Sequence, residues 1–236
     1  MLYLILASAG GGKTTHITNL IEQFSAGGNK KISLIVPEQF SFMSEKIMLE
    51  KVGAKAMADI DVLSFTSLGE KLVGRPALHE RRRLDDSARA VLMRLALDGV
   101  KHKLKLYANH VSKKSVISEF VALSSEFKQN AVSTDALRLA LASEKEGLLK
   151  MKLNDIVTVL DAYDAMVSGS YFNPDELLDE LYDILPENDY FKDRLVFIDA
   201  FRGFTVQEYK IIERMLTKAQ AVYVTLCTDN LQNSDD

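Results

Sequence analysis

The stretch that decides the fold is Ala7-Ser8-Ala9-Gly10-Gly11-Gly12-Lys13-Thr14-Thr15, near the start of the chain. It follows a short apolar run that begins at Tyr3, and it precedes a helical pattern that ends near Phe24. Glycines let backbone N–H groups turn inward around a phosphate, and a helix N-terminus adds a favourable dipole. The stretch therefore predicts a phosphate-binding loop between a strand and a helix.

Each residue of this loop has an expected role toward a nucleoside triphosphate such as ATP. We expect the backbone from Ala9 to Thr15, with Gly10, Gly11 and Gly12 at its centre, to surround the phosphates. Lys13 should reach the β- and γ-phosphates, and the Thr14 hydroxyl should bind Mg²⁺. The general form of such loops begins with glycine, and here that position is Ala7. The alternative is a glycine-rich turn followed by Lys-Thr by chance.

Outward from the loop, apolar runs alternate with helical patterns. Strands are predicted at 32–36 and 60–65, with a helix at 44–52 between them. Helical periodicity dominates from about 84 to 185, and the alternation then resumes with strands at 195–199 and 221–226 and a helix at 205–218. This order predicts an α/β fold, a phosphate-loop parallel sheet covered on both faces and interrupted by an all-helical insertion. The predicted parts are 1–75 and 191–236 for the sheet and 76–190 for the insertion.

The acidic half of the site is predicted at the end of the strand Leu195-Val196-Phe197-Ile198-Asp199. Asp199 should hold Mg²⁺ through water, and we expect its strand to lie beside the first strand. The next position, where many ATPases carry a catalytic glutamate, is Ala200. Slow hydrolysis, a substitute base or binding without hydrolysis would each explain this. Glu208 is a candidate substitute, against the simpler interpretation of a solvated helix residue.

Four stretches together resemble the N-terminal region of the B subunit of AddAB/RexAB-type ATP-dependent helicase/deoxyribonucleases. They are the Ala-x-Ala-Gly-x-Gly-Lys-Thr loop, the segment 36–42 (VPEQFSF) with Glu45, the segment 62–68 (VLSFTSL), and the segment 197–201 (FIDAF) followed by Phe204, Thr205 and Glu208. Their order spans the whole chain. The resemblance implies a degenerate, RecA-like first motor domain of a DNA repair helicase–nuclease.

Family members are several times longer, so the resemblance implies that this chain is a fragment. It also implies a partner A subunit with helicase activity, single-stranded or duplex-end DNA in the full complex, and an iron–sulfur cluster in a C-terminal nuclease that this sequence lacks. The Pro-Glu-Gln and Ser-Phe-Thr segments occupy the places of DNA-contacting motifs. Loop groups of Gln39, Ser64 and Thr66 would then bind phosphates, and Phe40, Phe42 or Phe65 would stack on bases. Core packing is the alternative for each phenylalanine, and a solvated face is the alternative for Arg81-Arg82-Arg83 as a DNA contact.

Composition sets outer limits on these functions. The 236 residues are 47% hydrophobic and 26% charged, with a net charge of −4, so overall charge gives no general attraction to nucleic acid. The single cysteine excludes a disulfide framework or a four-cysteine cluster within the chain and fits a reducing, cytoplasmic compartment. No apolar run reaches the ~20 residues of a membrane span. A small-molecule kinase and a nonenzymatic scaffold that binds ATP and docks a partner remain competing hypotheses.

Overall fold

The computed structural model describes residues 1–28, 31–74, 82–168, 171–172 and 176–228. The chain divides into two compact units. The sheet unit comprises Met1–Gly74 and Leu178–Asp236, and the helical unit comprises Arg75–Leu177. The sheet unit is therefore built from two segments of the chain, and the helical unit from the segment between them.

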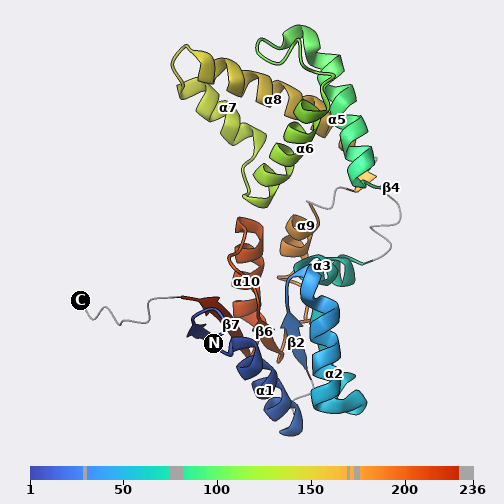
Figure 1. The fold of residues 1–236 in the computed structure, drawn as a ribbon, viewed down its shortest axis with the longest axis vertical. Coiled ribbons are helices and arrows are strands. Elements are labelled where there is room, and N and C mark those ends of the chain that lie inside the picture. The colour runs from blue at the N-terminus through green and yellow to red at the C-terminus, as the bar shows by residue number, and fades with distance from the viewer. Residues whose placement is uncertain (29–30, 75–81, 169–170, 173–175, 229–236) are drawn as a thin grey trace, which may run out of the picture. The chain divides into compact units, whose positions relative to one another are not determined.

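A five-stranded sheet forms the centre of the sheet unit, and all its strand pairs are parallel. Its order is β1-β7-β6-β2-β3, and Figure 1 shows the strands with the helices around them. Each strand is a short, mostly apolar run, as is typical of parallel strands in α/β folds. The strands are β1 (Leu2–Ala7), β2 (Ile32–Ile35), β3 (Ile60–Leu63), β6 (Leu195–Ile198) and β7 (Ala221–Cys227).

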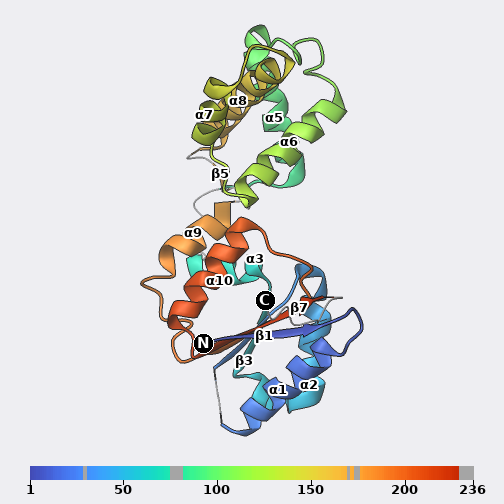
Figure 2. The same ribbon diagram turned by 90° about the vertical axis from the view of Figure 1, so that its left-hand side faces the viewer.

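Helices cover both faces of this sheet. Figure 2 shows α1 (Lys13–Ala26) and α2 (Ser41–Met57) on one face, and α3 (Phe65–Val73), α9 (Leu177–Ile184) and α10 (Val206–Lys218) on the other. A 3₁₀ turn, Glu38–Phe40, leads into α2. On the α1 face the rings of Tyr223 and Phe197 stack with centroids 4.7 Å apart, and Phe24 of α1 packs against both. The predicted α/β fold is confirmed.

The helix α9 belongs to the core of the sheet unit. Its Leu181 and the following Leu185 are buried in the same cluster as Val196, Val222 and the α10 residue Ile211. Sequence periodicity assigns this segment to the helical insertion because its pattern continues that of the helices before it. Packing of its apolar side against the sheet, which periodicity does not reveal, gives it to the other unit.

The edge strand β1 departs from the expectation of a sheet covered on both faces. Leu2, Leu4 and Leu6 are all exposed, Leu4 by 53%. Their neighbours in register on β7, Val222 and Val224, are buried under α10. The helices on that side cover the inner strands and leave this side of β1 open, so the expectation is wrong for the edge strand.

The helical unit has its own core. Here α5 (Asp86–Val100) packs against α6 (Lys114–Gln129) and α8 (Leu148–Val167), and α7 (Thr134–Ser143) packs against α8. Tyr163 of α8 lies fully buried among these helices. A 3₁₀ turn, Lys101–Lys103, follows α5, and two short strands, β4 (Arg82–Arg83) and β5 (Tyr171–Phe172), pair in parallel. None of the helices in the described ranges is long and apolar enough to cross a membrane.

Candidate nucleotide-binding site

The parallel sheet brings most of the predicted site residues together at the carboxyl ends of its strands. Because all five strands run the same way, their carboxyl ends lie together, which is where open α/β sheets bind ligands. The glycine-rich loop follows β1, Glu38 follows β2, Ser64 follows β3 and Asp199 follows β6. Segments that are up to about 190 residues apart in the sequence thus lie at the same end of the sheet.

The loop after β1 has a backbone that needs its glycines. Gly10 and Gly12 have φ angles of 74° and 79°, in the left-handed region that favours glycine. Gly11 has no room for a side chain, since an added Cβ would lie 2.9 Å from Ala7 Cβ and 3.0 Å from the Ser8 carbonyl oxygen. The Gly11 amide donates to that same oxygen at 3.0 Å, which closes the turn. The conformation of this loop therefore favours glycine at all three positions, Gly10, Gly11 and Gly12.

The loop presents unpaired amides at the start of a helix. The helix α1 begins at Lys13, and its N-cap residue, Gly12, has no side chain to accept from the first turn. The His16 amide is the first to bond back, to the Gly12 carbonyl at 2.9 Å. The amides of Lys13, Thr14 and Thr15 have no acceptor within the helix. These residues and the three glycines line a hollow of about 250 Å³.

The Lys13 side chain curls over this loop. Its ammonium donates to the carbonyl oxygens of Ala7 at 3.0 Å and Ser8 at 2.8 Å. An ammonium has three protons, so one remains for a ligand in the hollow. The exposed Thr14 hydroxyl stands at the same helix end. The donor set of amides, an ammonium and a hydroxyl fits a polyphosphate with its cation.

Asp199 lies two strands away from the loop, contrary to the expectation of adjacent strands. β7 runs between β1 and β6, which puts those two strands roughly 10 Å apart at the usual strand spacing. The position of β7 could not be predicted from the sequence because its pairing with β1 joins segments from opposite ends of the chain. Asp199 is 3% exposed, and Thr225 of the inserted strand donates its hydroxyl proton to Asp199 Oδ1 at 2.5 Å. Thr225 is a site residue that the sequence-based prediction missed, although a hydroxyl within the apolar strand 221–226 was a usable signal.

The position after Asp199 offers no base, and the candidate substitute, Glu208, is engaged in capping a helix. Ala200 turns the chain with a left-handed φ of 67°. Glu208 lies in the first turn of α10, where its Oε2 accepts from the Thr205 amide at 2.8 Å, while the Glu208 amide donates to the Thr205 hydroxyl. This reciprocal pair is a capping box, which the Thr-x-x-Glu spacing signals in sequence. The Glu208 carboxylate is used to begin a helix.

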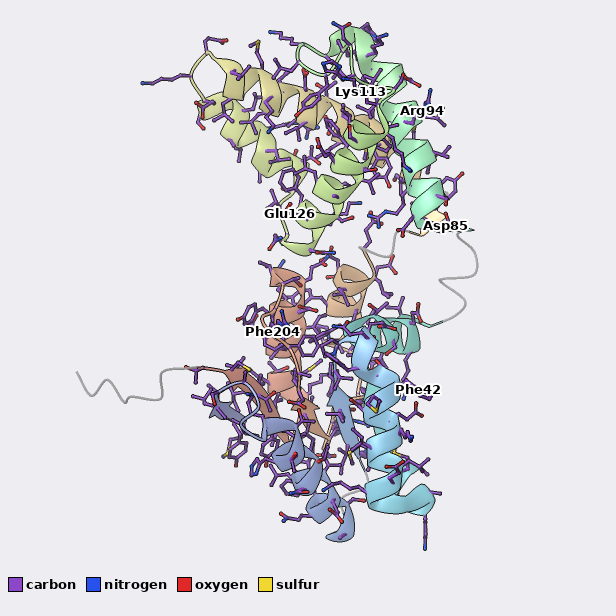
Figure 3. All side chains as sticks on the ribbon, viewed as in Figure 1. Phe42, Asp85, Arg94, Lys113, Glu126 and Phe204 are labelled. Atoms are coloured by element: carbon purple, nitrogen blue, oxygen red, sulfur yellow. The ribbon has the colours of Figure 1, made fainter. Side chains whose placement is uncertain are left out.

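The predicted DNA-contacting residues fall into exposed and engaged groups. Gln39, Phe40 and Thr66 are exposed. Phe42, at the start of α2 in Figure 3, is 79% exposed and available for stacking.

Ser64 and Phe65 are engaged inside the protein. The Ser64 hydroxyl accepts from the Ser67 amide at 3.0 Å as the cap of α3 and also bonds to Glu38. Phe65 is 4% exposed and packs edge-on against Phe201 at 5.4 Å between centroids. Core packing, the alternative for this phenylalanine, is what the structure shows. Of the three-arginine segment, Arg81 and the side chains of Arg82 and Arg83 lie outside the described residues.

No preformed metal cage exists in the described part of the chain, where no three His, Cys, Asp or Glu side chains converge. Mg²⁺ bound with a nucleotide does not need one. It is usually held by one or two protein oxygens, substrate phosphates and waters. The Thr14 hydroxyl and the Asp199 carboxylate are the candidate protein oxygens for that kind of site.

Comparison with known proteins places the chain in a family. Residues 4–236 match the family model described as "ADDB, N-terminal". A protein of Lachnoclostridium phytofermentans is 28% identical over 233 residues, 98% of this chain and 20% of that protein. Proteins of Clostridium tetani and Listeria innocua are 30% and 29% identical over 99% and 95% of the chain. All three are named as the B subunit of an ATP-dependent helicase/deoxyribonuclease, and the chain spans about one fifth of their length. The chain therefore belongs to the ADDB N-terminal family, whose named relatives are components of helicase–nucleases.

Proposed function

We propose that this chain is the nucleotide-binding part of the B subunit of a DNA repair helicase–nuclease and that it binds ATP with Mg²⁺. The observation that carries the proposal is the hollow lined by residues 10–15, where the amides of Lys13, Thr14 and Thr15 have no acceptor within the helix and the Lys13 ammonium lies over the loop. Such a nest of amides at a helix N-terminus favours a phosphate group. The kinase hypothesis loses support because the matched relatives are named as helicase–nuclease components.

We infer that the site binds nucleotide more readily than it hydrolyses it. The loop amides and Lys13 would hold the phosphates, and Thr14 and Asp199 would hold Mg²⁺, which supplies charge neutralisation when bound. A general base would have to stand beside the attacking water. Ala200 has none to offer, and Glu208 is used as a helix cap. The chain is accordingly weak or inactive as a motor by itself.

The partners follow from the same assignment. We expect the full protein to act with an A-type helicase partner and to meet single-stranded DNA or duplex ends. Within this chain, the exposed Gln39, Phe40, Phe42 and Thr66 are the candidate DNA contacts. Thr66 and Gln39 would bind backbone phosphates, and the two phenylalanine rings would stack on bases.

Titration of the chain with fluorescent mant-ATP, with and without Mg²⁺, tests the proposal. Lys13→Ala should raise the Kd at least about tenfold, the effect of losing a charge-assisted hydrogen bond. Lys55→Ala, an exposed lysine on α2, is the matched control and should bind like the parent. Equal binding by the Lys13 variant and the parent would refute the nucleotide site. DNA-stimulated hydrolysis by the parent chain would contradict the inference drawn from Ala200.

A further inference from the structure

The buried hydroxyl of Thr225 lies between the two halves of the candidate site. Thr225 is 2% exposed in β7, whose other residues in the stretch 221–227 are Ala, Val, Tyr, Leu and Cys. A buried polar group requires a hydrogen-bond partner. Its hydroxyl donates to Asp199 Oδ1, and the two residues form a polar pair inside an apolar sheet.

Strand register fixes this pair on the side of the phosphate loop. Ile198 is in register with Val224, so Asp199 follows beside Thr225, and Ile5 of β1 is in register with Thr225 from the other side. Phe197 and Tyr223 stack on the α1 face. Side chains two residues further along a strand point to the same face. Asp199 and Thr225 therefore lie on the face covered by α1, the helix that begins at the loop.

The bond to Thr225 leaves half of the Asp199 carboxylate unused. The hydroxyl donates to Oδ1 only, and no donor from the described residues reaches Oδ2. A carboxylate with one oxygen held in place loses rotational freedom, while its second oxygen keeps its lone pairs. In metal sites, groups that hydrogen-bond a ligand orient it and tune its affinity.

We propose that Thr225 is the residue that positions Asp199 for Mg²⁺, so that Oδ1 is held by the hydroxyl and Oδ2 faces the metal or its bound water. The inference rests on the proposed function, since it assigns a residue to the same nucleotide site. By this proposal β7, the strand between the glycine-rich loop and Asp199, contributes a positioning residue to the site. Thr225 itself touches neither nucleotide nor metal.

The test separates metal-dependent from metal-independent binding. Thr225→Val keeps the shape and removes the donor. Mant-ATP binding without Mg²⁺ should equal that of the parent, and the gain in affinity on adding Mg²⁺ should fall roughly tenfold, as for other removed partners of metal ligands. Thr225→Ser should restore the gain. In an Asp199→Asn background, Thr225→Val should have no further effect. An unchanged Mg²⁺ gain in Thr225→Val, or additive effects in the double variant, would overturn the proposal.

Controls distinguish positioning from stability and from failure of the site as a whole. Ser33→Ala removes another buried sheet hydroxyl, bonded to Tyr190 near the amino end of β2, and should leave the Mg²⁺ gain unchanged. If Thr225→Val does not fold, Thr225→Cys, a weaker donor of similar size, replaces it. Loss of binding in Lys13→Ala with a full Mg²⁺ gain in the Thr225 variant would remove this inference alone. Parent-like binding by Lys13→Ala would remove the nucleotide site itself.

Discussion

Two turns of this molecule bring backbone amides together, but only one of them provides an acceptor for those amides. In the helical unit, the amides of Lys105, Leu106 and Tyr107 all donate to the buried carboxylate of Asp155 on α8, at 2.7 to 3.2 Å. In the sheet unit, the amides of the loop 10–15 stand at an exposed helix end with no side-chain cap. One turn carries its own anion, and the other does not.

The difference separates a structural turn from a candidate binding turn. Converging N–H groups create a site of positive potential that favours an anion. Asp155 fills that site permanently, so the turn after α5 has nothing to offer a ligand. The glycine-rich loop instead has the Lys13 ammonium over its carbonyl oxygens, which adds positive charge. An amide nest with no internal carboxylate is therefore the better predictor of a ligand.

The largest expected effect is on the stability of the turn at 105–107, whose amides donate to Asp155. Asp155→Ala leaves three partly buried amides without their acceptor and should lower the free energy of unfolding of the helical unit by about 3 kcal/mol. Urea denaturation followed by circular dichroism measures this loss. Asp161→Ala on the same helix removes an exposed partner of Arg138 and should cost less than about 1 kcal/mol. Equal costs for the two variants would mean that the gathered amides are not what Asp155 stabilises.

A smaller effect is expected for a change in the glycine-rich loop 10–15, and it concerns nucleotide binding instead of folding. Gly11→Ala places a Cβ against Ala7 and the Ser8 carbonyl, so the loop must shift and its amides no longer converge. The Kd for mant-ATP should rise about tenfold, which corresponds to about 1.4 kcal/mol. Gly99→Ala in α5, where nothing lies near the added Cβ, is the matched control. Unchanged binding in Gly11→Ala would show that the tight turn is not needed for the ligand.

The smallest effect concerns another carboxylate with partners inside the protein, Asp61 on β3. Burial raises its pKa, but hydrogen bonds from Lys71 and Tyr190 and the charges of Lys71 and Arg194 outweigh burial and hold the pKa below its ordinary value. A lowered pKa stabilises the fold above the ordinary value near 3.8, and this stability is lost as pH falls through the folded-state pKa.

Asp61→Asn should therefore cost about 1 kcal/mol at pH 7, a figure reduced for partial exposure, and the difference from the parent should shrink below about pH 4. Urea denaturation at several pH values measures both. Asp59→Asn, an exposed neighbour, should show neither effect. A difference that stays constant down to pH 2 would show that charge at Asp61 is not the cause.

Local sequence signals are sufficient for the fold and for the loop. Short apolar runs that alternate with helical patterns predict the strands, and the three glycines with Lys-Thr predict a turn whose φ angles favour glycine at two positions. The start of α10 carries its own signal in Thr205 and Glu208, and this signal belongs to a helix cap and not to a catalytic base. Local patterns report backbone conformation well because the interactions behind them are local.

Long-range relations could not be predicted in the same way. The insertion of β7 between β1 and β6 depends on where a crossover ends, and the pairing of Thr225 with Asp199 depends on that insertion. Phe65 and Phe40 have similar neighbours in sequence, yet one is buried against Phe201 and the other is exposed. Burial is decided by which elements meet, and no residue pattern within either segment contains that information.

The exposed side of β1 affects the tendency of the chain to associate with other copies of itself. Leu2, Leu4 and Leu6 form an apolar strip on β1, and among the described residues no strand pairs with the outer N–H and C=O groups of this strand. Such an edge is a template for pairing with another chain. Covering the strip gains about 25 cal/mol for each Å² of apolar surface removed from water. We therefore expect the chain to self-associate through this edge in concentrated solution, and Leu4→Lys to reduce that association in analytical ultracentrifugation.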